Sequence, residues 1–169
     1  MSNVGNVMMR MIEYDRGDPK RIQHFIKVYQ FAALIGKMEH VDTRTQEIIE
    51  ISALVHDIGI KVSEEKYHSS AGKYQEIEGP PLAKTLLKSL DYPVPFINRV
   101  CWLVGHHHTY NDIKNIDHQI LVEADFLVNA YEDNLSVPSI RKVLTELFRT
   151  TSGKWLLQTM YLGQNRKQD

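Results

Sequence analysis

The segment from Ile120 to Tyr131, ILVEADFLVNAY, is apolar on nearly every face when its residues are placed at helical spacing. A helix of this kind has no face to offer to water, so we expect it to run through the middle of a core, over residues 118–131. A buried carboxylate needs a partner, because its desolvation costs several kcal/mol. Asp125, in the middle of the segment, must therefore be paired with a basic side chain or bound to a metal ion.

The rest of the chain repeats the helical pattern. Its 169 residues, 43% hydrophobic and 24% charged, have the size and composition of one ordinary globular domain. No alternating apolar pattern of convincing length indicates a strand, so we predict an all-α, single-domain helical bundle over 1–169 with seven to eight helices. Residues 61–73 have no clean period and are expected to form a loop or weak helix that covers a cleft. The other predicted helices span 19–38, 44–57, 80–90, 96–104 and 138–149, with a last one from 152 onward.

Charge and cysteine content exclude several classes of protein. Twenty basic and twenty-one acidic residues give a net charge of -1, so there is no overall positive field for nucleic acid or an anionic membrane. The single cysteine, Cys101, forbids an internal disulfide and lies among apolar residues, which favours a core position over a nucleophile. With no apolar run of about 20 residues and no signal peptide, a cytoplasmic protein is expected. Gly-rich phosphate loops, GxSxG and HExxH motifs are also absent from the sequence.

Two further polar positions lie against apolar helix faces. His24 belongs to the first long predicted helix, and His56-Asp57 ends the second, directly after the core-like run ISALV. Each has an ordinary explanation alone, as a hydrogen-bonded core histidine or a histidine beside the carbonyl end of a helix. Together with Asp125, they place imidazoles and carboxylates on three helices, which is how a bundle builds a metal site in its core. These ligands suit magnesium or first-row divalent ions.

The order of these residues resembles that of the HD-domain superfamily of metal-dependent phosphohydrolases. The resemblance rests on RIQHFIKVYQFAALIG around His24, ALVHDIGIK around the doublet and ILVEADFLVNA around Asp125, and it is strongest over 18–131. It implies that residues 132–169 are C-terminal helices packed on this core. It also implies a divalent metal ion (Mn, Mg, Co, Ni or Fe) held by His24, His56, Asp57 and Asp125.

The resemblance extends to positions that binuclear members of the family use for a second ion. EIEGPPLAKTLL is similar to a segment that carries a further histidine in those members, and Glu78 stands at that position here. VCWLVGHHHTYND is similar to their next histidine pair, which makes His106 and His107 the matching residues and leaves His108 in an exposed loop. As ligands, these three would let Asp57 bridge two ions about 3.5–4 Å apart. Otherwise Glu78 is a base or water orienter and the two histidines donate to phosphate; one ion is favoured, with two as the alternative.

Two cationic side chains flank the expected site. Lys61 follows the doublet and Arg21 precedes His24, and either could contact a phosphate or simply be solvated. The remaining histidines, His40, His68 and His118, have no comparable context and are expected at the surface. The predicted catalytic residues are therefore Glu78, Lys61, His106 and His107.

These features lead to one functional expectation and two alternatives. We expect a phosphomonoesterase or phosphodiesterase that cleaves a small phosphorylated metabolite, a nucleotide above all, with metal-activated water. The same fold could instead serve a catalytically silent ligand-sensing or scaffold protein, or a di-iron oxygenase with the same cage. The expected partner is the phosphorylated substrate rather than nucleic acid or a membrane, and the expected assembly is a monomer or homodimer.

Overall fold

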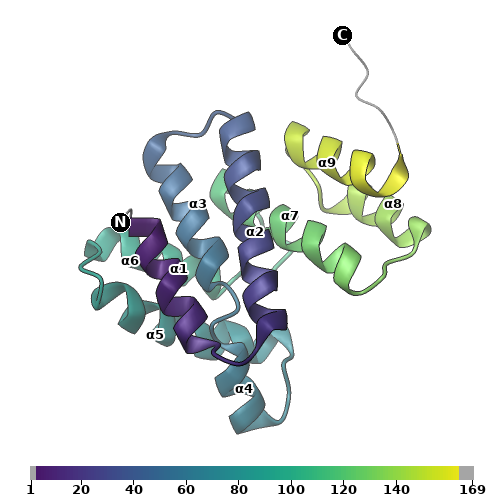
Figure 1. The fold of residues 1–169 in the computed structure, drawn as a ribbon. Helices are drawn as coiled ribbons and strands as arrows, with labels where there is room; N and C mark the ends of the chain where they lie inside the picture. The colour runs from purple at the N-terminus through teal and green to yellow at the C-terminus, as the bar shows by residue number, and fades with distance from the viewer. Residues whose placement is uncertain (1–2, 164–169) are drawn as a thin grey trace.

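The structure, a computed structural model, describes residues 3–163. Figure 1 shows α-helices joined by short turns, and the described residues contain no strand. The prediction of an all-α fold is confirmed. The helices are α1 (Asn3–Tyr14), α2 (Pro19–Met38), α3 (Thr43–Val55), α4 (Ile60–Tyr67), α5 (Gly72–Lys88), α6 (Val94–Val104), α7 (Ile116–Glu132), α8 (Val137–Glu146) and α9 (Thr151–Leu162).

Helix α7 forms the centre of the bundle, where it packs against α2 and α3 (Figure 1). Leu121 and Leu127 of α7 are fully buried, as are Ile49 and Leu54 of α3. Buried residues occur on every face of α7, which agrees with its lack of a polar face. These three helices provide the backbone positions from which the candidate ligands project.

Local capping sets the starts of α2 and α3. Asp18 accepts a hydrogen bond from the backbone N–H of Arg21, and Pro19 occupies the first position of α2. Asp42 caps α3 in the same way, by accepting from backbone N–H groups in the first turn. Helix α2 has the predicted bounds, 19–38, because both its start signal and its apolar pattern are local.

The region after α3 differs from the sequence expectation. Most of residues 61–73 form the short helix α4 and the turn after it, in line with the weak-helix alternative, but α5 already begins at Gly72. The predicted helix start at Pro80 is wrong, since that proline lies inside α5. Packing explains the longer helix: a Cβ added at Gly59 would lie 2.8 Å from the backbone nitrogen of Gly79. The missing side chain lets the turn after α3 press directly against α5.

The remaining helices cover the bundle on two sides. Figure 1 shows α8 and α9 on the opposite side of α2 from α5 and α6. Helix α9 packs on α7 and α2, while α1 packs on α3, α2 and α5 through the fully buried side chains of Val7 and Met11. No helix within residues 3–163 has both the length and the apolar composition to cross a membrane.

Candidate metal centre

Four side chains from three packed segments converge at the end of α3. His24 projects from α2 and Asp125 from α7, while His56 and Asp57 follow Val55, the last residue of α3. Because the helix has ended, two adjacent side chains can face one space; in a regular helix they would diverge by about 100°. The local geometry thus explains how both members of the doublet contribute to one site.

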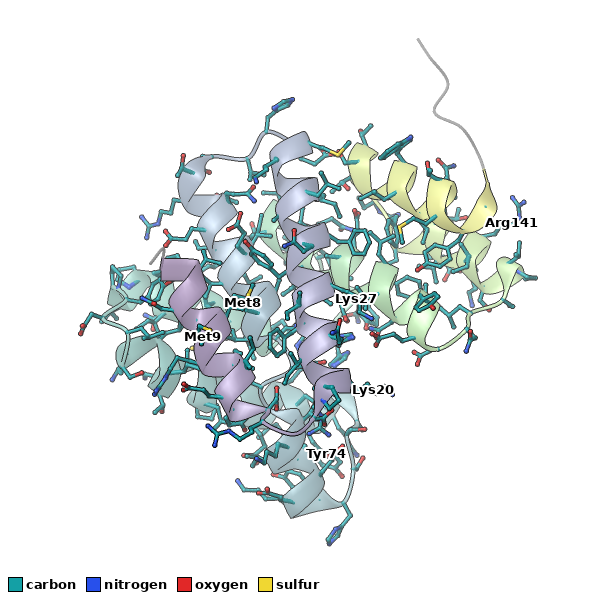
Figure 2. All side chains as sticks on the ribbon, in the orientation of Figure 1. Met8, Met9, Lys20, Lys27, Tyr74 and Arg141 are labelled. Atoms are coloured by element: carbon teal, nitrogen blue, oxygen red, sulfur yellow. The ribbon has the colours of Figure 1, made fainter. Side chains whose placement is uncertain are left out.

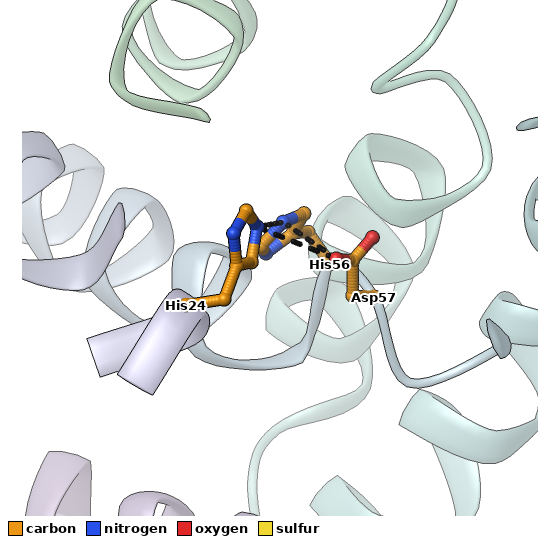
Figure 3. A group of neighbouring side chains, drawn as sticks. All are labelled: His24, His56 and Asp57. Carbon is orange, nitrogen blue, oxygen red and sulfur yellow. Dashed lines mark hydrogen bonds and ion pairs between the residues drawn. The ribbon is translucent and has the colours of Figure 1, made fainter. Parts of the chain in front are cut away.

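The ligand atoms of this group lie within contact distance of one another. His24 Nε2 and His56 Nε2 are 3.3 Å apart, and each is 3.4 Å from Asp57 Oδ2 (Figure 3). Asp125 Oδ1 lies 3.2 Å from His24 Nε2 and 3.5 Å from His56 Nε2. His56 is fully buried, and His24 and Asp125 are nearly so. The four residues therefore form one compact, largely buried polar cluster.

The other ring nitrogens show which atoms carry the protons. His56 Nδ1 lies 2.8 Å from the carbonyl oxygen of Ala53, and His24 Nδ1 lies 2.9 Å from Glu132 Oε2. Both oxygens accept, so each Nδ1–H donates and each neutral imidazole has a lone pair at Nε2. Two lone pairs and two carboxylates then face one another, an arrangement that is repulsive without a cation or proton between them. The donor set fits a divalent metal ion.

The pKa shifts of the histidines and aspartates in the cluster also indicate that positive charge is stabilised there. Burial alone would raise the pKa of Asp125, but hydrogen bonds from His24 and His56 hold it far below its usual range. Burial works against protonation of His56, yet Asp57 and Asp125 raise its pKa to about 9. In the metal-free protein, imidazole protons therefore supply the charge that a bound ion would otherwise supply.

A second group of ligand atoms shares Asp57. Asp57, His107 and His108 each offer one ligand atom, all within 4.8 Å of one another. His107 is 1% exposed, and its Nδ1–H donates to the carbonyl of Val104 at 2.7 Å. Its Nε2 is buried without a hydrogen-bond partner among the described residues, and Asp57 Oδ1 lies 3.5 Å away. An orphaned imidazole lone pair beside a carboxylate is a second position suited to a cation.

His108 completes this second group in its neutral form. Burial and the neighbouring His107 lower the pKa of His108 to about 4. Its Nε2 lies 3.3 Å from Gln75 Oε1, and its Nδ1 lies 3.3 Å from the hydroxyl of Tyr110. The ring packs against Gly72, where an added Cβ would come within 2.7 Å of it. Glycine at this position thus makes room for the imidazole.

A cleft of about 430 Å³ gives access to both groups. Asp57 and Asp125 line it together with His24 and His108. Lys20 and Arg21, from the first turn of α2, add positive charge to the wall of the cleft. Figure 2 shows Lys20 and Lys27 on the same side of α2. The candidate ligands are therefore open to a small molecule from one side.

The comparisons with known proteins agree with this geometry. A family model, the HD domain, matches residues 21–137, a span that contains both groups of ligands. The chain belongs to the HD domain family. Among solved structures, the crystal structure of a predicted HD superfamily hydrolase from an uncultured Thermotogales bacterium matches with a TM-score of 0.66 and 23% identity, over 96% of this chain and 86% of that chain. That likeness shows a shared fold; no curated protein matches the chain.

This HD domain brings together most of the residues singled out from the sequence. His24, His56 and Asp57 form the first group, with Asp125 beside both imidazoles, and the role of these four residues as metal ligands stays a prediction supported by the converging atoms. His107 lies beside Asp57 as expected.

Of the three consecutive histidines, His108 rather than His106 lies with His107 at the site. His106 stacks on Trp102 with ring centroids 4.1 Å apart and does not line the cleft. The expectation that His106 lies at the site and His108 in an exposed loop is therefore corrected. Helix α6 ends at Val104, and in the following turn the side-chain directions no longer follow helical periodicity.

Two other predicted catalytic residues lie away from the cleft. Glu78 accepts hydrogen bonds from Lys66 Nζ and from the Tyr67 hydroxyl, both at 2.8 Å, and these bonds lower its pKa. Lys61 Nζ lies over the ring of Tyr14, 5.6 Å from its centroid. Neither lines the cleft, so the placement expected from the sequence is not reproduced for these two residues.

Arg21 does line the cleft, but it is engaged within the protein. Its guanidinium donates to Glu64 Oε2 at 2.6 Å and lies 3.4 Å from Asp18. These carboxylates keep its pKa raised even though burial acts to lower it. Arg21 is therefore a partly neutralised cation at the edge of the site.

Besides Glu132, which accepts from His24, sequence reasoning missed three polar residues around the ligands. Asn129 donates to Asp125 Oδ1 at 2.9 Å, and Gln75 contacts His108. His118, expected at the surface, is 1% exposed and its Nε2–H donates at 2.8 Å to the carbonyl of His106, in the turn that carries the histidine run. Asn129 follows Asp125 by four residues, a spacing that places both on one helix face and could have revealed it.

Proposed function

We propose that this HD domain protein is a metal-dependent phosphohydrolase that cleaves small phosphate esters. The observation that carries the proposal is the convergence of imidazole Nε2 atoms and carboxylate oxygens on one side of an open cleft, where a bound cation can take the place of the imidazole protons. Membership of the HD domain family supports it, as does the name of the structural neighbour, a predicted HD superfamily hydrolase.

In this proposal, His24, His56, Asp57 and Asp125 hold one divalent ion tightly. A bound ion of this kind acidifies water and stabilises charge on phosphoryl oxygens. His107 and His108 offer a weaker second position through their shared neighbour Asp57, because the Nε2 of His108 is already hydrogen-bonded by Gln75. We therefore favour one tightly bound ion, and a second ion at higher metal concentration.

The lining of the cleft suggests the size and polarity of the substrate. Its volume of about 430 Å³ suits a small molecule, and Lys20 and Arg21 lie where a phosphate could meet positive charge. Its described lining contains Ser70, Gln75 and Asn129 but no Phe, Tyr or Trp on which a nucleobase could stack. We therefore favour a phosphate ester with a small hydrophilic leaving group, with nucleotides as the competing class.

A metal-defined substrate panel tests the proposal. Protein purified without chelator is analysed for bound metal and assayed, with added Mn²⁺, on p-nitrophenyl phosphate, bis-p-nitrophenyl phosphate, ribose 5-phosphate and nucleoside monophosphates. We expect hydrolysis that EDTA abolishes and that Asp57→Asn removes, while Glu146→Gln, a substitution at an exposed position on α8, leaves it unchanged. Activity on the monoester but not the diester would assign the enzyme to the phosphomonoesterases.

Three other outcomes would overturn the proposal. Metal-loaded protein that hydrolyses none of the phosphate esters is not this phosphohydrolase. Tight binding of a phosphate ester without turnover would favour the ligand-sensing alternative. An iron-dependent absorbance that changes with oxygen, together with oxygen consumption, would favour the di-iron oxygenase.

A further inference from the structure

A chain of three side chains connects the surface of the bundle to the proposed metal ligand His24. Lys27 Nζ donates to Glu132 Oε1 at 2.6 Å, and Glu132 Oε2 accepts from His24 Nδ1 at 2.9 Å. Lys27 and His24 belong to α2, whereas Glu132 is the last residue of α7. The side chains of His24 and Glu132 are 9% and 15% exposed, so the hydrogen bond between them is largely shielded from water, whereas Lys27, at 39%, reaches the surface.

Three of the four candidate imidazole ligands, His24, His56 and His107, differ in what holds their Nδ1 atom. The Nδ1 atoms of His56 and His107 donate to backbone carbonyls three residues earlier, at Ala53 and Val104. Those acceptors belong to the same local turn and cannot be changed by a side-chain substitution. His24 has a side-chain acceptor instead, and that acceptor comes from another helix. The tautomer of His24 therefore depends on tertiary packing.

A carboxylate suits the position of Glu132 for a specific reason. Lys27 offers donors alone, and His24 must also donate from Nδ1 if its Nε2 is to keep a lone pair. A carboxylate has two accepting oxygens and serves both neighbours at once. A glutamine in the same place has one accepting oxygen and one donating amide group, so it could satisfy only one of them.

We propose that Glu132 is the positioning residue that sets the tautomer of His24, and that Lys27 makes a carboxylate necessary there. This inference rests on the proposed function to the extent that His24 is a metal ligand. Outer partners of metal-bound histidines commonly fix the ring orientation and the tautomer in this way. In this role Glu132 acts through His24, although its side chain also lines the cleft.

The proposal predicts an unusual pattern of loss and rescue. In Glu132→Gln, Lys27 attracts the amide oxygen and the NH₂ group turns towards His24. The neutral imidazole then accepts at Nδ1, and its single proton moves to Nε2, where it points at the metal position. In Lys27→Met/Glu132→Gln, the amide oxygen is free to accept from Nδ1–H again, so the original tautomer returns.

Two measurements on the full chain test this pattern. The first is the ¹⁵N NMR signature of the His24 tautomer in metal-free protein, recorded at a pH where a titration of the same signals shows the His24 ring to be neutral. The second is Mn²⁺ affinity, measured from the EPR signal of free Mn²⁺. We expect Glu132→Gln to place the proton on Nε2 and to weaken Mn²⁺ binding by about 10- to 100-fold. The double variant should recover the Nδ1–H tautomer and most of the affinity.

Matched variants separate this role from a general loss of structure. Lys27→Met alone should keep the wild-type tautomer and bind Mn²⁺ within about 3-fold of wild type, because Glu132 still accepts from His24. Lys142→Met and Glu146→Gln alter an exposed Lys–Glu pair on α8 and should leave both measurements unchanged. Circular dichroism confirms folding. If Glu132→Gln fails to fold, the NMR measurement on wild-type protein still tests the proposal, because a neutral His24 with its proton on Nε2 would overturn it.

The outcomes distinguish this inference from the proposed function. An unchanged His24 tautomer in Glu132→Gln, or a double variant no better than Glu132→Gln, overturns the positioning role. Wild-type protein that binds no Mn²⁺ would instead contradict the metal centre, while the NMR comparison would still decide the role of Glu132.

Discussion

Glu123 and Asp125 are two buried carboxylates on the same helix, α7, but their surroundings are opposite. Glu123 is 0% exposed and meets donors alone: the Gln119 side chain at 2.7 Å, the backbone N–H groups of Arg149 at 2.6 Å and Thr150 at 3.0 Å, and the Thr150 hydroxyl. Asp125 is 5% exposed and accepts from the Asn129 amide at 2.9 Å. Its other neighbours are His24 Nε2 at 3.2 Å and His56 Nε2 at 3.5 Å, which stabilise the carboxylate only when a proton or cation lies between them.

This difference distinguishes a carboxylate that supports the fold from one that is suited to binding a cation. Glu123 lies at the N-terminus of α9, where N–H groups without helical partners accommodate negative charge, and its hydrogen bonds tie the C-terminal helices to α7. Asp125 has one fixed donor, the Asn129 amide, and its imidazole neighbours stabilise the carboxylate only when a proton or cation is present. The number of donors around a buried carboxylate thus indicates whether the site still needs a ligand.

The largest effect should follow from removing the carboxylate that needs a cation. Asp125→Asn keeps the size of the side chain but removes its charge, so Mn²⁺ affinity should fall by more than ~100-fold, beyond the loss typical of an outer partner. Hydrolysis should fall to background while circular dichroism stays unchanged. Mn²⁺ titration followed by EPR measures the loss, and wild-type affinity in this variant would contradict the assignment of Asp125.

Removing the other carboxylate should damage stability instead. Glu123→Ala leaves several buried donors without an acceptor, and we expect the free energy of unfolding to drop by roughly 3–5 kcal/mol. Urea denaturation measures this change. Folded Glu123→Ala should bind Mn²⁺ as tightly as wild type, and a large loss of affinity would show that the two carboxylates are not independent.

The pH dependence of stability should distinguish the two environments further. In metal-free protein, the pKa of His56 is about 9 in the folded state against 6.5 for the free side chain. A raised pKa means that the folded state binds the proton more tightly, so its stabilisation is complete below pH 6.5 and disappears as the pH rises through 9. The loss should be at most ~3 kcal/mol, by linkage over that interval.

Urea denaturation in EDTA at several pH values measures this loss. Asp125→Asn should lower the pH at which stability falls, because Asp125 is one of the groups that raise the pKa of His56. In Glu123→Gln, the free energy of unfolding should fall over the same alkaline pH range as in wild type. If the free energy of unfolding fell over the same alkaline pH range in wild type and in Asp125→Asn, Asp125 would not act on the imidazole of His56.

Much of this comparison could be anticipated from the sequence, because Asp125 and its apolar surroundings are local features of one segment. The all-α fold, the bounds of α2 and the convergence of His24, His56 and Asp57 also follow from local patterns and their order along the chain. Helix α1 was not predicted, although Val7 and Met11 follow the helical period, because the mixed composition of residues 1–15 conceals the pattern.

Other parts of the site depend on contacts that no local pattern contains. Apart from Gln119, the donors of Glu123 come from residues 26 and 27 positions later, and Glu132 reaches His24 across 108 positions. The choice of His108 over His106 is made in a turn after α6, where helical periodicity has ended. The start of α5 at Gly72 depends on close backbone packing against the turn after α3, which outweighs the usual meaning of proline as a helix start.

The smallest effect should come from crowding Glu123 without removing it. A Cβ added at Gly153 would overlap Glu123 Oε2 and would lie 2.7 Å from Thr150 Oγ1, so Gly153→Ala must displace either the carboxylate or the first turn of α9. We expect a loss of about 1–2 kcal/mol, as for other overpacked sites. Thr151→Ala, an exposed substitution in the same turn, is the control for the general effect of changing α9. Thermal unfolding should show a lower midpoint for Gly153→Ala than for the control, with equal Mn²⁺ affinity in both. If Gly153→Ala were as stable as the control, the carboxylate of Glu123 could shift freely, and its role as the rigid link between α7 and α9 would be refuted even though its buried position is unchanged.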